Sequence, residues 1–225
     1  MTLQLSSTPL GHSTARVEVA TRLRRLICSG ALPGGSHLVQ SEIADQFGVS
    51  VTPVREALRD LFSAGFIEFH AFQGAVVKPP SIDELRDLYE LRVFLAPLVV
   101  RRSIGQIEPW RLDEAEEVAA RMVDATPESW IDDNRWFHQL LGEPTEGTQL
   151  GGFEQRFATL AERYVGLTLL EADGRRADDE RDHVDLVRAY RHLDTDRAIE
   201  LTVDHLRAGL ASAIDAHHRS EEATS

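Results

Sequence analysis

The stretch GVSVTPVREALRDLFSAGFI, residues 48–67, decides the fold of the first third of the chain. Four of its apolar residues recur at the i, i+3, i+4 and i+7 spacing of one helix face: Val54, Ala57, Leu58 and Leu61. Pro53 falls where a first-turn proline leaves helical hydrogen bonds intact. The pattern therefore predicts an amphipathic helix that presents Arg55 and Arg59 on its outer face.

Two shorter helical patterns precede this helix. Apolar residues at helical spacing from Ser13 onward predict a helix that ends near Gly30. Ser41 is expected to cap a short helix that ends at Gly48, and its inward residues would be Ile43, Ala44 and Phe47. The third helix would start at Ser50 or Thr52 and end at Gly65.

Two short apolar runs follow, at 66–69 and 75–77, and the turn between them contains Gly74. They predict a small β-hairpin. The order helix, helix, turn, helix, hairpin is that of a winged helix-turn-helix. Pro79-Pro80 then marks a stiff boundary, because neither a helix nor a central strand continues through it.

The remainder of the chain has helical periodicity. Ser81 and Glu84 fit a capping box that opens a helix to about Ser103. Further helices are predicted over 109–124, 128–141, 149–171, 176–192 and 194–218, with a loop at 142–147 and a helix stop at 172–174. The expected fold class is mainly α, with an N-terminal winged helix-turn-helix and a C-terminal all-α bundle. The expected organisation is a flexible tail (1–12), a DNA-binding domain (13–78), a linker (79–82), a helical effector-binding and dimerisation domain (83–218) and a second tail (219–225).

Charge divides unevenly along the 225 residues, which carry a net charge of −13. Residues 1–78 hold seven Lys/Arg and six Asp/Glu, whereas the remainder holds 17 and 31. A polyanion such as DNA would be repelled by the second part but not by the first. No run of about 18 apolar residues predicts a membrane span, and we expect a cytoplasmic protein. Cys28 is the only cysteine, which excludes an intrachain disulfide.

In a helix-turn-helix, the second helix enters the major groove with its first residues against the base edges. Arg55 is therefore a candidate for a bidentate contact with guanine, and Thr52 for a contact with phosphate or a thymine methyl. Arg59, further along the helix, suits the phosphate backbone. The alternative is that both arginines simply form a solvated helix face.

Several fixed spacings favour DNA binding: LPGGSHL (32–38), SEIA (41–44), FGVS (47–50), TPVREAL (52–58) and the wing residue Gly74. Together they resemble the DNA-binding domain of GntR-family bacterial transcription regulators. The resemblance implies DNA contacts by Ser41, Ser50, Val51, Thr52, Arg55, Arg59 and Gly74. Family members usually carry an arginine where this chain has Val51. We expect Val51 to make an apolar contact, as with a thymine methyl, and the operator to depart from the family consensus.

Three histidines lie within predicted helices: His138, His183 and His205. Asn134 precedes His138 by four residues, so both project from one helix face. Each histidine could be purely structural, but imidazoles from several helices beside an oxygen donor are a usual way for a bundle to bind a metal. Asp133 cannot replace Asn134, because it lies about 100° around the helix.

Residues 81–218 also look like the ligand-sensing FCD domain of the FadR-type branch of the same family. That resemblance implies a divalent metal held by Asn134, His138, His183 and His205, and we expect the ion to be zinc or nickel. It also implies a small carboxylate effector, with Arg92 as its cationic partner and Arg163 as a weaker candidate. Both arginines could instead form salt bridges. The family's glutamate after Arg92 is replaced by Ala96, and Pro97 is expected to kink the helix.

The sequence thus predicts a homodimeric, ligand-responsive repressor that binds an inverted-repeat DNA operator and has no membrane partner. We assign no catalytic residue, because motifs typical of hydrolases, P-loops and Rossmann folds are lacking. One alternative is a metal-dependent hydrolase that carries a winged-helix domain. Another is a metal-stabilised bundle that uses its winged helix to contact protein.

Overall fold

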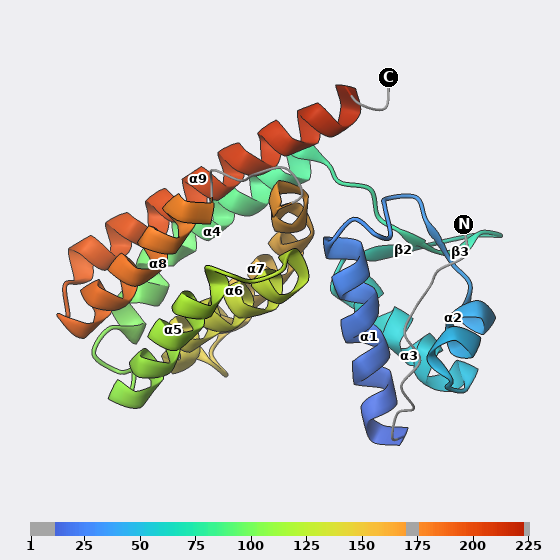
Figure 1. Cartoon of the computed structure of the whole chain (residues 1–225), viewed down its shortest axis with the longest axis horizontal. Coiled ribbons are helices and arrows are strands. Elements are labelled where there is room, and N and C mark those ends of the chain that lie inside the picture. Colours follow the sequence, from blue (N-terminus) through green and yellow to red (C-terminus); the bar gives the residue numbers. More distant parts are fainter. Residues whose placement is uncertain (1–11, 170–175, 223–225) are drawn as a thin grey trace. The chain divides into compact units, whose positions relative to one another are not determined.

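The computed structural model describes residues 12–169 and 176–222 (Figure 1). The chain divides into two compact units, one ending at Pro80 and the other beginning at Ser81. Among the described residues, none of the helices is long and apolar enough to cross a membrane.

The first unit is a winged helix-turn-helix, as the sequence predicts. Its elements are α1 (His12–Cys28), β1 (His37–Leu38), α2 (Gln40–Phe47), α3 (Val51–Ser63), β2 (Ile67–His70) and β3 (Gly74–Val77). The sheet is antiparallel in the order β1-β3-β2, with Phe69 opposite Ala75 in the hairpin. The sequence did not predict β1, because two residues are too few to show an alternating pattern.

The core of this unit lies between the three helices. The predicted inner faces of α2 and α3 are all buried, to 3% exposure or less: Ile43, Ala44, Phe47, Val54, Ala57, Leu58 and Leu61. Gly48 adopts φ 65° and ends α2 in the left-handed conformation that favours glycine. The prediction that Ser41 caps α2 is wrong, because the helix already begins at Gln40. Val39 occupies the cap position, and no side chain forms a cap hydrogen bond.

The second unit is an all-α bundle. Its elements are α4 (Ile82–Ser103), α5 (Pro109–Met122), α6 (Pro127–Gly142), the 3-10 helix η1 (Glu143–Thr145), α7 (Gln149–Leu169), α8 (Arg176–Arg191) and α9 (Thr195–Glu222). The 142–147 segment, predicted as a loop, thus contains a 3-10 turn. The stop predicted at 172–174 lies outside the described residues.

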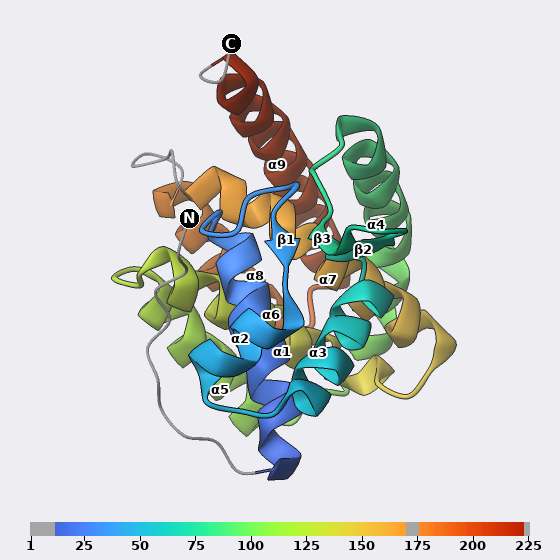
Figure 2. The same ribbon diagram turned by 90° about the vertical axis from the view of Figure 1, so that its right-hand side faces the viewer.

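Helix α4 packs along α9 and α7 (Figure 2). Its Leu85, Leu88, Tyr89 and Ala96 form a core with Ala161, Tyr164, Leu206 and Ala213. Ser81 caps α4 as expected, since its hydroxyl accepts a hydrogen bond from the Glu84 backbone N–H at 3.4 Å. The helix continues as one α-helix through Pro97 to Ser103.

Candidate metal and effector site and DNA-facing helix

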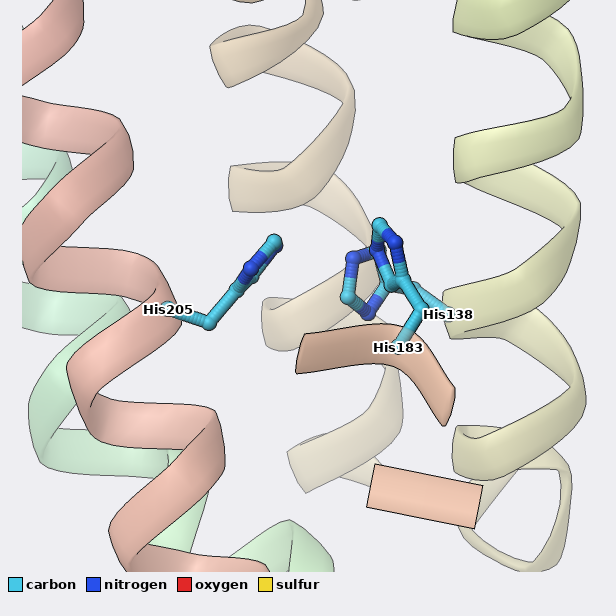
Figure 3. A group of neighbouring side chains, drawn as sticks. All are labelled: His138, His183 and His205. Atoms are coloured by element: carbon cyan, nitrogen blue, oxygen red, sulfur yellow. The ribbon is translucent and has the colours of Figure 1, made fainter. Parts of the chain in front are cut away.

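Three histidines from three helices meet in the bundle. His138 comes from α6, His183 from α8 and His205 from α9, and the three rings face one another (Figure 3). Ring centroids are 5.5 Å apart for His138 and His183, 5.3 Å for His138 and His205, and 4.9 Å for His183 and His205. One nitrogen of each ring lies within 4.8 Å of the other two.

Burial keeps two of these imidazoles neutral. Desolvation lowers the pKa of His138 well below its usual value of 6.5, and electrostatic interaction with the neighbouring His205 and His183 rings and with Arg92 lowers it further. Desolvation, followed by the charge of His205, has the same effect on the pKa of His183. A neutral imidazole offers the lone pair that a metal ion requires.

Buried polar atoms around the rings lack ordinary partners. Within the described residues, both ring nitrogens of His183, Nδ1 of His205 and Oδ1 of Asn134 are buried without a hydrogen bond. Such atoms carry a desolvation cost unless something binds them. Asp133, by contrast, is engaged by Arg121 at 2.8 Å, which agrees with its exclusion as a ligand.

The donor set fits a divalent transition metal. Nitrogens bound to one tetrahedral zinc ion at about 2.1 Å lie about 3.4 Å apart. The observed nitrogen separations, within 4.8 Å, would therefore have to shorten by up to about 1.4 Å through inward ring movement. Asp182 Oδ2 lies 3.7 Å from Nδ1 of His205, and a carboxylate beside a ligating imidazole is a common outer partner.

A cavity of about 530 Å³ opens beside the histidines, and His138, His205, Asn134 and Arg92 all line it. Arg92 is only 9% exposed, and its Nε is buried without a hydrogen bond within the described structure. Its guanidinium lies over the Tyr89 ring at 5.4 Å, and its NH2 group is 3.6 Å from Glu154 Oε1. A buried guanidinium beside a metal site can bind a carboxylate from its far side.

Arg163 lies elsewhere. Its NH2 group donates to Glu84 Oε2 and, at 2.7 Å, to the Tyr164 hydroxyl, and it is not among the residues that line the cavity. The structure therefore places Arg163 in the salt bridge that the sequence left as its alternative. This bridge holds the start of α4 against α7.

Other cavity residues escaped the sequence analysis. Arg135 and the buried Glu162 approach each other to 3.7 Å, and Glu154 faces Arg92. Part of the wall has no side chains at all, since Gly142 and Gly152 face open space. Charges on three different helices give no local signal, because only the folded bundle brings them to one cavity.

The predicted DNA-facing residues of α3 are all exposed. They are Ser50 at the N-cap, then Val51, Thr52, Arg55 and Arg59, and Val51 is 44% exposed. Neither Arg55 nor Arg59 forms a hydrogen bond or ion pair with any residue in the described ranges. Asp60 instead pairs with Arg16, at 2.6 Å, and ties α3 to α1. Two arginines thus remain available on the outer face of α3.

Ser41 and Gly74 are also exposed. Gly74 adopts φ 75° where the hairpin turns, a conformation that other residues rarely adopt. The same turn carries Phe72, with φ 70° and a fully exposed ring, which the sequence analysis did not select. Phe72 and Gly74 lie at the tip of the wing, whereas Ser41 lies on α2.

Comparison with known proteins agrees with this architecture. Residues 15–77 match the family described as "Bacterial regulatory proteins, gntR family", and residues 87–208 match the FCD domain. The "Uncharacterized HTH-type transcriptional regulator BphR" of Paraburkholderia xenovorans is 28% identical over 222 residues, covering 92% of this chain and 88% of BphR. The "Gluconate operon transcriptional repressor" of Bacillus subtilis is 34% identical over 138 residues, or 59% of this chain and 56% of the repressor.

Among solved structures, Escherichia coli McbR/YncC has a TM-score of 0.78 at 20% identity, covering 90% of this chain and 98% of McbR. It shares the fold. The matched families and named relatives are transcriptional regulators and not enzymes, as expected. The protein therefore belongs to the gntR family of bacterial regulatory proteins, in the branch that carries an FCD domain, and it is a DNA-binding transcriptional regulator.

Proposed function

We propose that the protein is a homodimeric repressor whose helical domain binds a divalent metal and a carboxylate effector. The observation that carries this proposal is the meeting of three imidazoles, two of which, His138 and His205, line one cavity together with Arg92. Asn134, His138, His183 and His205 would hold the ion, with zinc or nickel preferred by this donor set. The bound ion would supply positive charge and open coordination positions for a carboxylate.

Arg92 would bind the effector from the other side. Its burial and its contact with Tyr89 fix the guanidinium, so a carboxylate would be bound without ordering a flexible side chain. The cavity of about 530 Å³ leaves room for a carboxylate with a larger body, which the glycine wall at Gly142 and Gly152 would accommodate.

Residues 13–78 would bind DNA and residues 83–218 would bind the effector and form the dimer, in the cytoplasm. Two copies of α3 would read an inverted repeat, with Arg55 and Thr52 at base edges and Ser41, Arg59 and the wing at Gly74 on the backbone. Repression, relieved by the effector, is favoured because the similar gluconate operon protein is named a repressor. To control occupancy, the effector must prefer one state by several kcal/mol.

Thermal melting across a set of carboxylates, with zinc, nickel or a chelator, tests the proposal. We expect certain carboxylates to raise the melting temperature only when metal is present, and the same compounds to release bound DNA. If no carboxylate shifts the melt with or without metal, the effector class is wrong. If stabilisation is unaffected by chelator, the metal has no part in it.

A further inference from the structure

Helix α4 turns an apolar stripe away from its own bundle. Phe94 is 73% exposed, and Leu91 and Leu98 are 45% and 46% exposed. At 100° per residue, Leu91 and Leu98 lie within about 60° of Phe94 around the helix. The buried side of the same helix carries Leu85, Leu88, Tyr89, Arg92, Ala96 and Val100. Most of Phe94 and nearly half of Leu91 and Leu98 are therefore left uncovered by the bundle.

Charges of opposite sign flank this stripe. Towards the N-terminus of α4, the exposed face carries three acidic residues, Asp83, Asp87 and Glu90, and one basic residue, Arg86, which lies 3.8 Å from Asp83. Towards the C-terminus it carries Arg101 and Arg102. Asp87, Glu90, Arg101 and Arg102 form no hydrogen bond or ion pair with other residues of the described structure. From the N-terminus to the C-terminus of α4, the residues that project in the direction of Phe94 are thus first acidic, then apolar and then basic.

Two of the charged residues, Asp87 and Arg101, are placed symmetrically about Phe94. Asp87 lies seven residues before it and Arg101 seven residues after it, and each projects within about 20° of the Phe94 direction. When two copies of such a helix pack antiparallel across a two-fold axis at Phe94, Asp87 of each copy faces Arg101 of the other. Residues with this relation are what an isologous interface requires.

We propose that the exposed face of α4 is the dimer interface, and that two copies pair antiparallel with Phe94 at the two-fold axis. The helix macrodipole by itself favours acidic residues at the start of a helix and basic ones at the end. It gives no reason to expose Phe94, Leu91 and Leu98 between them. A second copy satisfies both features, because it buries the apolar centre and pairs the charged ends.

This inference rests on the dimer of the proposed function and specifies its surface and register. Sedimentation analysis of the full-length native chain and of Phe94→Asp gives the first test. A charge buried at the centre of an interface is expected to raise the dimer dissociation constant at least about 100-fold. Phe72→Asp, which changes another exposed phenylalanine, this one in the first unit, is expected to leave the dimer unchanged.

Charge reversal tests the register. Asp87→Arg sets two guanidinium groups against each other in both halves of the dimer, and Arg101→Asp places two carboxylates together. Each variant alone is expected to weaken self-association about tenfold. Mixing the two variants restores both attractive pairs in a heterodimer, so the mixture is expected to dimerise as well as the native chain. Asp124→Arg, on the α5–α6 connection, is the charge control.

The outcomes separate this inference from the proposed function. If the native chain and Phe94→Asp are both dimeric, α4 is not the dimer interface, but the proposed function as a dimeric regulator is unaffected. If both charge variants weaken the dimer but their mixture does not recover, α4 lies at the interface in another register and the antiparallel pairing is overturned. If the native chain is monomeric at micromolar concentration, the dimer itself fails. Circular dichroism spectra that match the native chain show that each variant is folded.

Discussion

The ring centroids of His183 and His205 lie 4.9 Å apart, although one ring comes from α8 and the other from α9. Both nitrogens of His183 are buried with no hydrogen bond to the described residues. A core histidine normally bonds at least one nitrogen, because an unbonded buried polar group costs about 1–3 kcal/mol. A metal ion bound between the rings would give a partner to one of these buried His183 nitrogens.

Metal binding is expected to stabilise the helical unit. At 100 times its dissociation constant, a ligand adds about 2.7 kcal/mol to the free energy of unfolding, or roughly 5–10 °C in melting temperature. We predict this rise for the native chain with zinc or nickel and its loss in His183→Ala. The exposed His218→Ala is the matched control and should respond like the native chain. An equal rise in both variants would place the metal elsewhere.

The free energy of unfolding of the metal-free protein should depend on pH. Because the folded-state pKa values of His138 and His183 lie well below 6.5, the unfolded chain takes up protons first as the pH falls. Their contribution is complete above about pH 6.5 and declines below it, by up to about 1.4 kcal/mol per pH unit for each histidine.

Urea denaturation in chelator at several pH values between 5 and 8 measures this dependence. His183→Gln removes one of the two groups, so its stability should fall less steeply below pH 6.5 than that of the native chain. His218→Gln should retain the native slope. A native stability that stays constant from pH 7 to pH 5 would contradict the buried, neutral state of these rings.

Arg92 should control effector affinity without controlling metal affinity. A hydrogen bond to a charged group contributes about 1.5–3 kcal/mol, so Arg92→Ala should weaken effector binding roughly 10- to 100-fold. Arg92→Lys keeps the charge but loses the fork, and it should recover only part of the affinity. Calorimetry measures both constants, and the exposed Arg207→Ala serves as the control. Unchanged effector affinity in Arg92→Ala would remove Arg92 from the site.

Both ends of the linker are held within their own units. A Cβ added at Gly34 would lie 2.7 Å from Cα of Pro79, so this glycine is required for the close approach of the linker. At the other end, the Ser81 N–H donates to the Tyr164 hydroxyl at 3.3 Å. Because neither end is free to slide, we propose that the linker carries the effector signal between the units.

Inserting Gly-Ser-Gly-Ser after Pro80 should therefore abolish effector-controlled release of DNA while leaving effector and metal affinities unchanged. Gly34→Ala should have the same effect to a lesser degree. Fluorescence anisotropy of labelled DNA, titrated with effector, gives the readout. If the effector still releases DNA from the insertion variant, at the concentration that releases DNA from the native chain, rigid coupling is excluded.

Much of this fold follows from local patterns. The apolar faces of α2 and α3, the end of α2 at Gly48 and the capping by Ser81 all depend on a few neighbouring residues, and the sequence predicts each correctly. The strand β1 is too short to show a period. The capping of α2 by Ser41 is wrong because Gln40 already belongs to the helix, and helix ends are not fixed by cap residues alone.

The site is only partly readable from the sequence. Asn134 and His138 share a helix face by spacing, whereas His183 and His205 approach them only through the packing of α8 and α9. Arg163 shows the limit of residue type as a guide. Both Arg92 and Arg163 are arginines on predicted helices, so the sequence offers both as effector ligands. In the folded bundle, the Arg163 guanidinium contacts Glu84 and Tyr164 and does not line the cavity.

Selection of bound sequences from a random duplex pool tests the central claim, that α3 reads DNA, most directly. The native chain is expected to enrich an inverted repeat. Arg55→Ala should lose the preference at one base pair of each half-site, at a cost of about 1–3 kcal/mol, and Val51→Arg should change the preference at another. The account would be contradicted if the native chain enriched no sequence. It would also be contradicted if Arg55→Ala enriched the same repeat as strongly as the native chain does.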